Sequence, residues 1–80
     1  MDKTVLFNVE ELKNAQIKAT LKEVYQSLEV RGYNPVNQIV GYLISGDPGY
    51  ISSYENARDK ILSLDRSELI AELLKKYIER

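Results

Sequence analysis

The stretch that decides the fold is residues 32–48, which read Gly32-Tyr-Asn-Pro-Val-Asn-Gln-Ile-Val-Gly-Tyr-Leu-Ile-Ser-Gly-Asp-Pro48. Its two ends carry signals that start and stop a helix. Asn34 can cap a helix that begins at Pro35, where the missing N–H of proline costs nothing. Gly46 and Pro48 then favour termination. The sequence therefore predicts a helix over residues 35–45.

This helix has an apolar stripe at helical spacing, made of Val36, Ile39, Val40, Leu43 and Ile44. A helix of this length is marginal alone in water, so the rest of the chain must pack on it. Gly41 in its middle costs roughly 1 kcal/mol relative to alanine. We therefore expect another backbone to approach Gly41 closely, in the same molecule or across a dimer. Tyr42 lies off the stripe.

Three more helices are predicted, over residues 10–31, 53–64 and 66–79. Each follows a capping residue with a glutamate three positions later, a pattern that marks helix starts. The three pairs are Asn8 with Glu11, Ser52 with Glu55, and Asp65 with Glu68. For the first of these helices a later start near Asn14 is an equal alternative.

Apolar residues at helical spacing give each of these helices an apolar face, which for the 53–64 helix is expected to be the inner row. They are Ile17, Leu21, Val24, Tyr25 and Leu28 in the first, Tyr54, Ala57, Ile61 and Leu64 in the second, and Leu69, Ile70, Leu73, Leu74, Tyr77 and Ile78 in the third. Arg58 and Lys60 are expected on the outside.

The 80 residues are thus expected to form one all-α domain, a compact array of four helices joined by short turns. Residues 1–9 are expected to form an N-terminal arm, either a flexible tail or an edge strand, because residues 4–7 have strand character. The apolar faces of residues 35–45 and 66–79 are wide for a monomer. This surplus predicts a homodimer, the commonest way to cover such a surface.

The composition argues against several classes of function. The chain has no cysteine and no histidine, so we expect no disulfide, metal site, cofactor or catalytic residue. Its net charge is −1 and its basic and acidic residues are interspersed, which disfavours a nucleic-acid partner. No apolar run approaches the roughly 20 residues that cross a bilayer, and no secretory signal is apparent. We expect a cytoplasmic protein without membrane insertion.

The candidates for an interaction surface lie on and beside the 35–45 helix, and they are Tyr33, Asn34, Asn37, Gln38, Gly41, Tyr42 and Tyr50. The tyrosines would serve as interface anchors. The amide side chains either form a polar recognition patch or cap helices and bond neighbouring backbone, and the second role is the commoner one. Thr4 is a separate candidate, because a phosphate there would add about −1.5 to −2 charges to a nearly neutral molecule.

The stretch 32–48 resembles the core signature of the IreB family of small regulatory phosphoproteins from Gram-positive bacteria. The similarity continues through Tyr50, Asn56-Ala57-Arg58, Asp65-Arg66-x-Glu68-Leu69-Ile70 and Glu72-Leu73. Upstream, Lys3-Thr4-Val5-Leu6-Phe7 looks like the Thr-x-x-Phe opening of the family. The resemblance covers essentially the whole chain.

The resemblance implies a cytoplasmic, all-helical, non-enzymatic homodimer that is phosphorylated by a transmembrane Ser/Thr kinase with PASTA domains and dephosphorylated by a cognate phosphatase. It also implies negative regulation, through an unidentified downstream protein, of the cell-envelope stress response and of cephalosporin resistance. Of the family's phosphorylated threonines only Thr4 has a match here. Ser52 stands where the family often has proline, so we expect it to lengthen the 53–64 helix.

Two mechanisms remain open for a phosphorylated Thr4: the phosphate docks the arm on arginine or lysine groups, or it repels a partner. An alternative function is a constitutive protein–protein interaction module that uses the surface of the 35–45 helix and is not regulated by phosphorylation.

Overall fold

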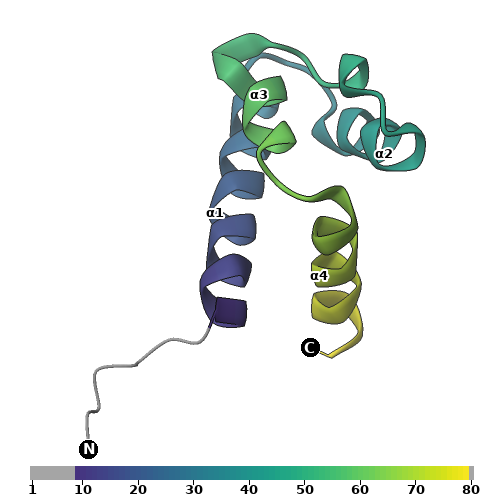
Figure 1. Ribbon diagram of the computed structural model, residues 1–80. Helices are drawn as coiled ribbons and strands as arrows, with labels where there is room; N and C mark the ends of the chain where they lie inside the picture. Colours follow the sequence, from purple (N-terminus) through teal and green to yellow (C-terminus); the bar gives the residue numbers. More distant parts are fainter. Residues whose placement is uncertain (1–8, 80) are drawn as a thin grey trace, which may run out of the picture.

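The fold is described from a computed structural model, which describes residues 9–79 (Figure 1). Four α-helices follow one another: α1 (Val9–Val30), α2 (Pro35–Ser45), α3 (Ala57–Leu62) and α4 (Arg66–Ile78). Two 3₁₀ turns, η1 (Pro48–Tyr50) and η2 (Tyr54–Asn56), lie between α2 and α3. Residues 9–79 contain no strand. The predicted all-α array of four helices is confirmed.

The two glycines that flank α2 each end a helix, as the sequence predicts for Gly46. Gly32, at φ +92°, follows α1, and the next N–H, that of Tyr33, donates to the carbonyl of Leu28 at 3.0 Å. Gly46, at φ +76°, ends α2 and donates its N–H to the carbonyl of Tyr42 at 2.7 Å. Both glycines adopt the left-handed conformation that closes a helix C-terminus. The predicted bounds 35–45 are therefore found unchanged.

α1 is the long axis of the molecule, and the other helices are arranged along it (Figure 1). α3 packs against α1, and α2 projects away from the same end of α1. α4 runs back beside the first half of α1, where Lys13 Nζ lies 3.2 Å from Glu68 Oε2. The two helices therefore form the two sides of one end of the molecule.

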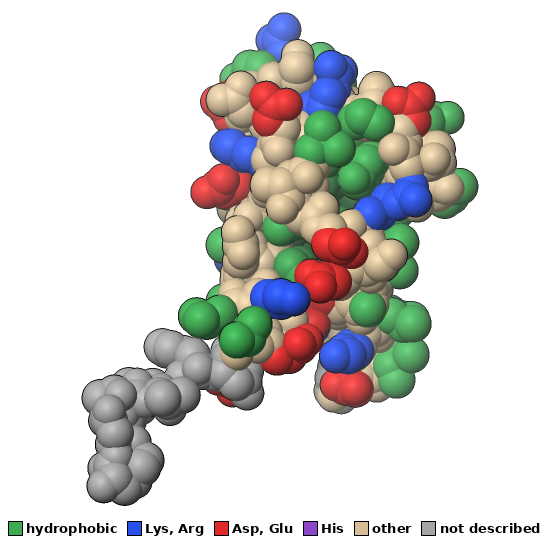
Figure 2. Space-filling view, viewed as in Figure 1, with side chains coloured by type: hydrophobic (Ala, Val, Ile, Leu, Met, Phe, Trp, Pro, Cys, Tyr) green, Lys and Arg blue, Asp and Glu red, His purple; other side chains and the backbone are tan. Residues whose placement is uncertain are grey.

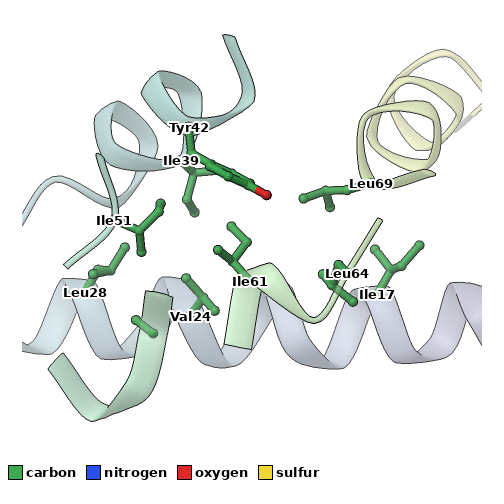
Figure 3. Close-up of a cluster of buried hydrophobic side chains, with 10 residues drawn as sticks. Ile17, Val24, Leu28, Ile39, Tyr42, Ile51, Ile61, Leu64 and Leu69 are labelled. Carbon is green, nitrogen blue, oxygen red and sulfur yellow. The ribbon is translucent and has the colours of Figure 1, made fainter. Parts of the chain in front are cut away.

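The core lies where α1, α2 and α3 meet (Figure 3). Its ten buried apolar residues are Ile17, Val24, Leu28, Ile39, Tyr42, Ile51, Ala57, Ile61, Leu64 and Leu69. Every helix contributes to it, and so do the connections, through Ile51 and Leu64. Leu69 is the only apolar residue that α4 buries among the described residues, so α4 is attached to the core at its first turn.

The inward face of α2 differs from the predicted stripe. Ile39 is buried and Leu43 is partly buried, but Val36, Val40 and Ile44 are exposed. Tyr42, expected off the stripe, is only 5% exposed, and its ring lies between α2 and Leu69 (Figure 3). A tyrosine ring is a large apolar body, so burying it outweighs burying the smaller valines and turns α2 toward the row of Ile39 and Tyr42.

The predicted apolar faces of α1 and α4 are also only partly buried. On α1, Ile17, Val24 and Leu28 are buried as predicted and Leu21 is partly buried, whereas Tyr25 is exposed. On α4 most of the predicted apolar face is exposed in the single chain, where its members after Leu69 are all exposed: Ile70, Leu73, Leu74, Tyr77 and Ile78. The cause is that α4 meets the body of the molecule with one narrow row, Leu69 and Glu72.

The predicted 53–64 helix is shorter than expected and starts later. Glu55 (φ 51°, ψ 35°) and Asn56 (φ 62°, ψ 24°) are both left-handed, so the right-handed helix begins only at Ala57. The Ser52–Glu55 capping box does not form, because the Glu55 carboxylate accepts a hydrogen bond from Ser27 instead, at 2.8 Å. Ser52 therefore does not lengthen this helix.

Other expectations about helix starts and outer faces are met in part. The Asp65 carboxylate accepts from the N–H of Glu68 at 2.9 Å and so caps α4, but the Glu68 side chain pairs with Lys13 and does not complete the box. The Asn8–Glu11 pair includes a residue outside the described ones. Arg58, expected outside, is half-buried, and its Nε donates to the carbonyl of Ile51 at 2.9 Å.

Candidate functional site

The amide side chains at the start of α2 have structural roles. Asn34 Oδ1 accepts from the N–H of Asn37 at 3.0 Å and so caps the helix. Gln38 Oε1 accepts from the N–H of Ser52 at 2.9 Å and ties the α2–α3 connection to α2. Of the two roles predicted for these amides, the commoner one is therefore found: Asn34 caps a helix and Gln38 bonds neighbouring backbone, while Asn37 keeps an exposed side chain.

Gly41 is the point of close approach that the sequence indicates, but the neighbour is a side chain. The ring of Tyr50 lies over it, and a Cβ placed on Gly41 would lie 2.5 Å from Tyr50 Cδ1. Gly41 thus serves as the seat of an aromatic ring within the same chain. Tyr50 itself stays 53% exposed on the other side of that contact.

The proposed interaction surface on α2 must be redrawn around these findings. Tyr42 cannot anchor a partner, because it is buried in the core. Tyr33, Asn37 and Tyr50 remain exposed. Thr4 lies outside the described residues.

Exposed apolar side chains gather on two helices instead, along the edge of the molecule where α2 and α4 lie (Figure 2). We call this set the α2–α4 apolar face, and it consists of Val36, Val40 and Ile44 on α2 and Ile70, Leu74, Tyr77 and Ile78 on α4. Ile44 is 81% exposed. Scattered exposed apolar residues are normal, but a set this large on two neighbouring helices is typical of an interaction surface.

A second feature is a groove between α1 and α4 with a volume of about 610 Å³. Its apolar lining includes Ile17, Leu21 and Tyr25 of α1 and Leu73 of α4. We call it the α1–α4 groove. Apolar walls of this kind favour an occupant that brings apolar side chains.

Charged side chains also line this groove. Lys18 and Lys22 come from α1, and Lys76 comes from α4. Two carboxylates, Glu29 and Glu72, lie there as well, and Glu72 Oε2 is 3.7 Å from Lys76 Nζ. Within residues 9–79, Lys18 and Lys22 form neither an ion pair nor a side-chain hydrogen bond. These two cations are thus available to an anionic group.

The sequence does carry a signal for this groove, although apolar periodicity alone does not reveal it. Lys18 and Lys22 are four residues apart, and so are Leu21 and Tyr25. Residues at this spacing share a helix face, which places a cationic row beside an apolar one. The groove itself depends on where α4 lies, and local sequence does not specify that.

Some kinds of site are absent from the described part of the chain. Across residues 9–79 no group of three or more acidic side chains is arranged to hold a metal ion. None of the described helices has the length and apolar character that crossing a membrane requires. The surfaces that remain are the α2–α4 apolar face and the α1–α4 groove.

Comparison with known protein families matches residues 2–79 to the family described as IreB regulatory phosphoprotein. The matched range includes Thr4, all four helices and both surfaces described above.

Proposed function

The chain belongs to the IreB family of regulatory phosphoproteins, and from this premise we propose that it is a non-enzymatic bacterial signalling protein phosphorylated on Thr4. The enzyme that phosphorylates it is a transmembrane Ser/Thr kinase with PASTA domains, and a cognate phosphatase reverses the modification. The protein acts in the cytoplasm. The family match over residues 2–79 is the observation that supports this proposal, since it includes the N-terminal segment with Thr4.

The position of the threonines also supports Thr4 as the site. Thr4 precedes the first described helical residue, Val9, by five positions, whereas Thr20 lies within α1. A kinase binds its target residue in extended backbone, and a hydroxyl inside a stable helix cannot reach that conformation without local unfolding. Thr20 is therefore the matched control within the same chain.

The test is phosphorylation in vitro by the catalytic domain of the PASTA kinase, followed by site mapping with tandem mass spectrometry. We expect one phosphate on Thr4, its removal by the phosphatase, and loss of labelling in Thr4→Ala but not in Thr20→Ala. Labelling of other residues with none on Thr4 would refute the proposal.

We further propose that the protein is a homodimer held by the α2–α4 apolar face. An apolar surface of this kind on two adjacent helices suits a symmetric contact, in which the same residues serve both copies. The exposed side chains of α4 favour this, because α4 buries only Leu69 and Glu72 against its own chain. Covering that face would give α4 the packing that the single chain does not provide.

The cellular role that we propose is negative regulation of the envelope stress response and of cephalosporin resistance. A host strain carrying Thr4→Ala should differ in cephalosporin resistance from one with the unchanged chain, and Thr20→Ala should not. Equal resistance in all three strains would contradict a regulatory role for Thr4.

The exposed apolar face also supports a second candidate function, a constitutive interaction module that needs no phosphate. Two further strains, carrying Asn37→Ala and Val40→Glu, separate the two functions. If Thr4→Ala keeps the cephalosporin resistance of the unchanged chain while Asn37→Ala or Val40→Glu alters it, the constitutive module is correct. Tyr42 is unsuitable for this comparison, because its burial means that a substitution would disturb the core.

A further inference from the structure

We propose that the N-terminal segment of the chain docks into the α1–α4 groove when Thr4 carries a phosphate, with Lys18 and Lys22 binding the phosphate. The inference rests on the proposed function only in taking Thr4 as the phosphorylated residue. It goes beyond it by naming the surface that receives the modified segment.

The chemistry of the groove matches that of the segment. The segment carries three consecutive apolar residues, Val5, Leu6 and Phe7, directly after Thr4. The groove combines apolar walls, Ile17 and Leu73 among them, with the two lysines. An occupant that is apolar and anionic side by side suits such a site, and the phosphorylated segment is both.

The position of the segment fits as well. It enters α1 at Val9, on the helix that forms one wall of the groove, and Lys18 lies nine residues further on, about 14 Å along the helix axis. The five residues from Thr4 to Val9 can extend to about 17 Å. A chain that turns back at the start of α1 can therefore bring Thr4 level with Lys18, and Lys22 lies one turn beyond.

Charge explains why docking should depend on the phosphate. The carboxylates of Glu29 and Glu72 also line the groove, and Glu72 pairs with Lys76, which leaves Lys18 and Lys22 for the incoming group. Without phosphate, Thr4 is neutral and the side chains of Asp2 and Lys3 cancel. The phosphate adds about −1.5 to −2 charges and three acceptor oxygens opposite the lysines. Two exposed ion pairs correspond to a rise of about two- to thirtyfold in the docking equilibrium constant.

The groove and the α2–α4 apolar face call for different occupants. The apolar face suits a second copy of the same surface. The α1–α4 groove has cations without partners among the described residues, and the chain that leads into α1 is tethered beside it, which raises its effective concentration there. A second copy in the groove is the competing occupant, and the experiment separates the two.

The experiment uses the full chain with phosphothreonine placed at position 4 during translation, so it does not require the kinase. The chain has no cysteine, so Asp2→Cys gives a single site for a nitroxide spin label. Paramagnetic broadening of the amide signals of Leu21, Tyr25 and Leu73 then reports docking, and the amide of Ile61 in the core serves as a reference. The same protein with unmodified threonine is the comparison.

We expect selective broadening at the groove that is stronger with the phosphate, is reduced at least about twofold by Lys18→Ala with Lys22→Ala, and is unaffected by Lys75→Ala. Lys75 is the matched control because it lies on α4 outside the groove lining. No selective broadening, or broadening that is equal with and without phosphate, would overturn the proposal.

A mixture of spin-labelled chains with separate ¹⁵N-labelled chains identifies the donor of the segment. Broadening that appears only between different chains would overturn docking within one chain. Protection of the groove amides from hydrogen exchange that rises with protein concentration without phosphate would assign the groove to a second copy. If the kinase does not phosphorylate Thr4, only the proposed function is refuted. If the segment with phosphothreonine at position 4 does not dock, only this inference is refuted.

Discussion

The hydroxyl of Ser27 donates a 2.8 Å hydrogen bond to the carboxylate of Glu55, which is 28 positions away in the chain. Ser27 is buried on α1, and Glu55 lies in the left-handed turn before α3. The bond holds that turn against α1 at the point where the backbone is strained. Next to it, the Arg31 guanidinium lies 5.3 Å from the ring centre of Tyr54, which attaches the same turn a second time.

Removal of the Ser27 hydroxyl should destabilise the fold. Ser27→Ala deletes the donor without leaving a cavity larger than one oxygen atom, so we expect a loss of about 1 kcal/mol in the free energy of unfolding. Urea denaturation at a fixed protein concentration measures it. Glu55→Gln keeps an acceptor and should cost less, and Ser67→Ala on the exposed surface should have no effect. Equal values for Ser27→Ala and Ser67→Ala would show that the bond contributes nothing.

The left-handed turn also predicts how substitutions at Asn56, which has φ 62°, affect the stability of the fold. Asparagine tolerates this conformation. For alanine the left-handed conformation costs roughly 1–2 kcal/mol, and for glycine it costs almost nothing. Asn56→Ala should therefore lower the free energy of unfolding by about 1 kcal/mol relative to Asn56→Gly. The ordinary helix preference would give the reverse order, so thermal denaturation of the two variants separates a left-handed turn from a continuous helix.

These turns show which parts of the fold local sequence can predict. Gly46 and Asp65 act through bonds to residues at most four positions away, and their predicted roles in ending and capping helices are found. Ser52 and Glu55 have the same local pattern, but Glu55 bonds to Ser27 on another helix. A pattern read within four residues cannot predict a partner 28 positions away.

The candidate surface also combines features that local sequence predicts with features that depend on tertiary packing. Helical spacing identifies the apolar residues of α2 but not the direction in which the helix is rotated, and the burial of Tyr42 decides that direction. The wide apolar faces of residues 35–45 and 66–79 are visible in the sequence. The α1–α4 groove is not, because it depends on the placement of α4 beside α1.

The contact between Gly41 and Tyr50 gives a prediction whose sign changes with the background. In the unchanged chain, Gly41→Ala would place a Cβ 2.5 Å from Tyr50 Cδ1, so the Tyr50 ring must move away from residue 41. We expect a net loss of about 1 kcal/mol, since the lost packing outweighs the helix preference of alanine. In a Tyr50→Ala background the same substitution should stabilise the fold by up to about 1 kcal/mol.

The four proteins of this double-mutant cycle are compared by urea denaturation at one protein concentration. The difference between the two effects of Gly41→Ala is the coupling between residues 41 and 50. If Gly41→Ala stabilises both backgrounds equally, the ring does not rest on Gly41, and the glycine needs another explanation.

The α2–α4 apolar face makes the prediction that separates a dimer from a monomer. Ile44 is 81% exposed on this face, so Ile44→Glu should leave the helical circular dichroism of the protein unchanged. Burial of an isoleucine at a subunit contact contributes about 1.5–3 kcal/mol, so its replacement by a charge should weaken self-association by at least about tenfold. Sedimentation velocity over a range of protein concentrations measures the dissociation constant. Val30→Glu is the matched control, because Val30 is 78% exposed at the end of α1, lies beside Glu55 and Lys60 and is not part of this face, so its substitution should leave the constant unchanged. A dimer that tolerates Ile44→Glu but dissociates with Val30→Glu would place the contact elsewhere, on the surface at the end of α1.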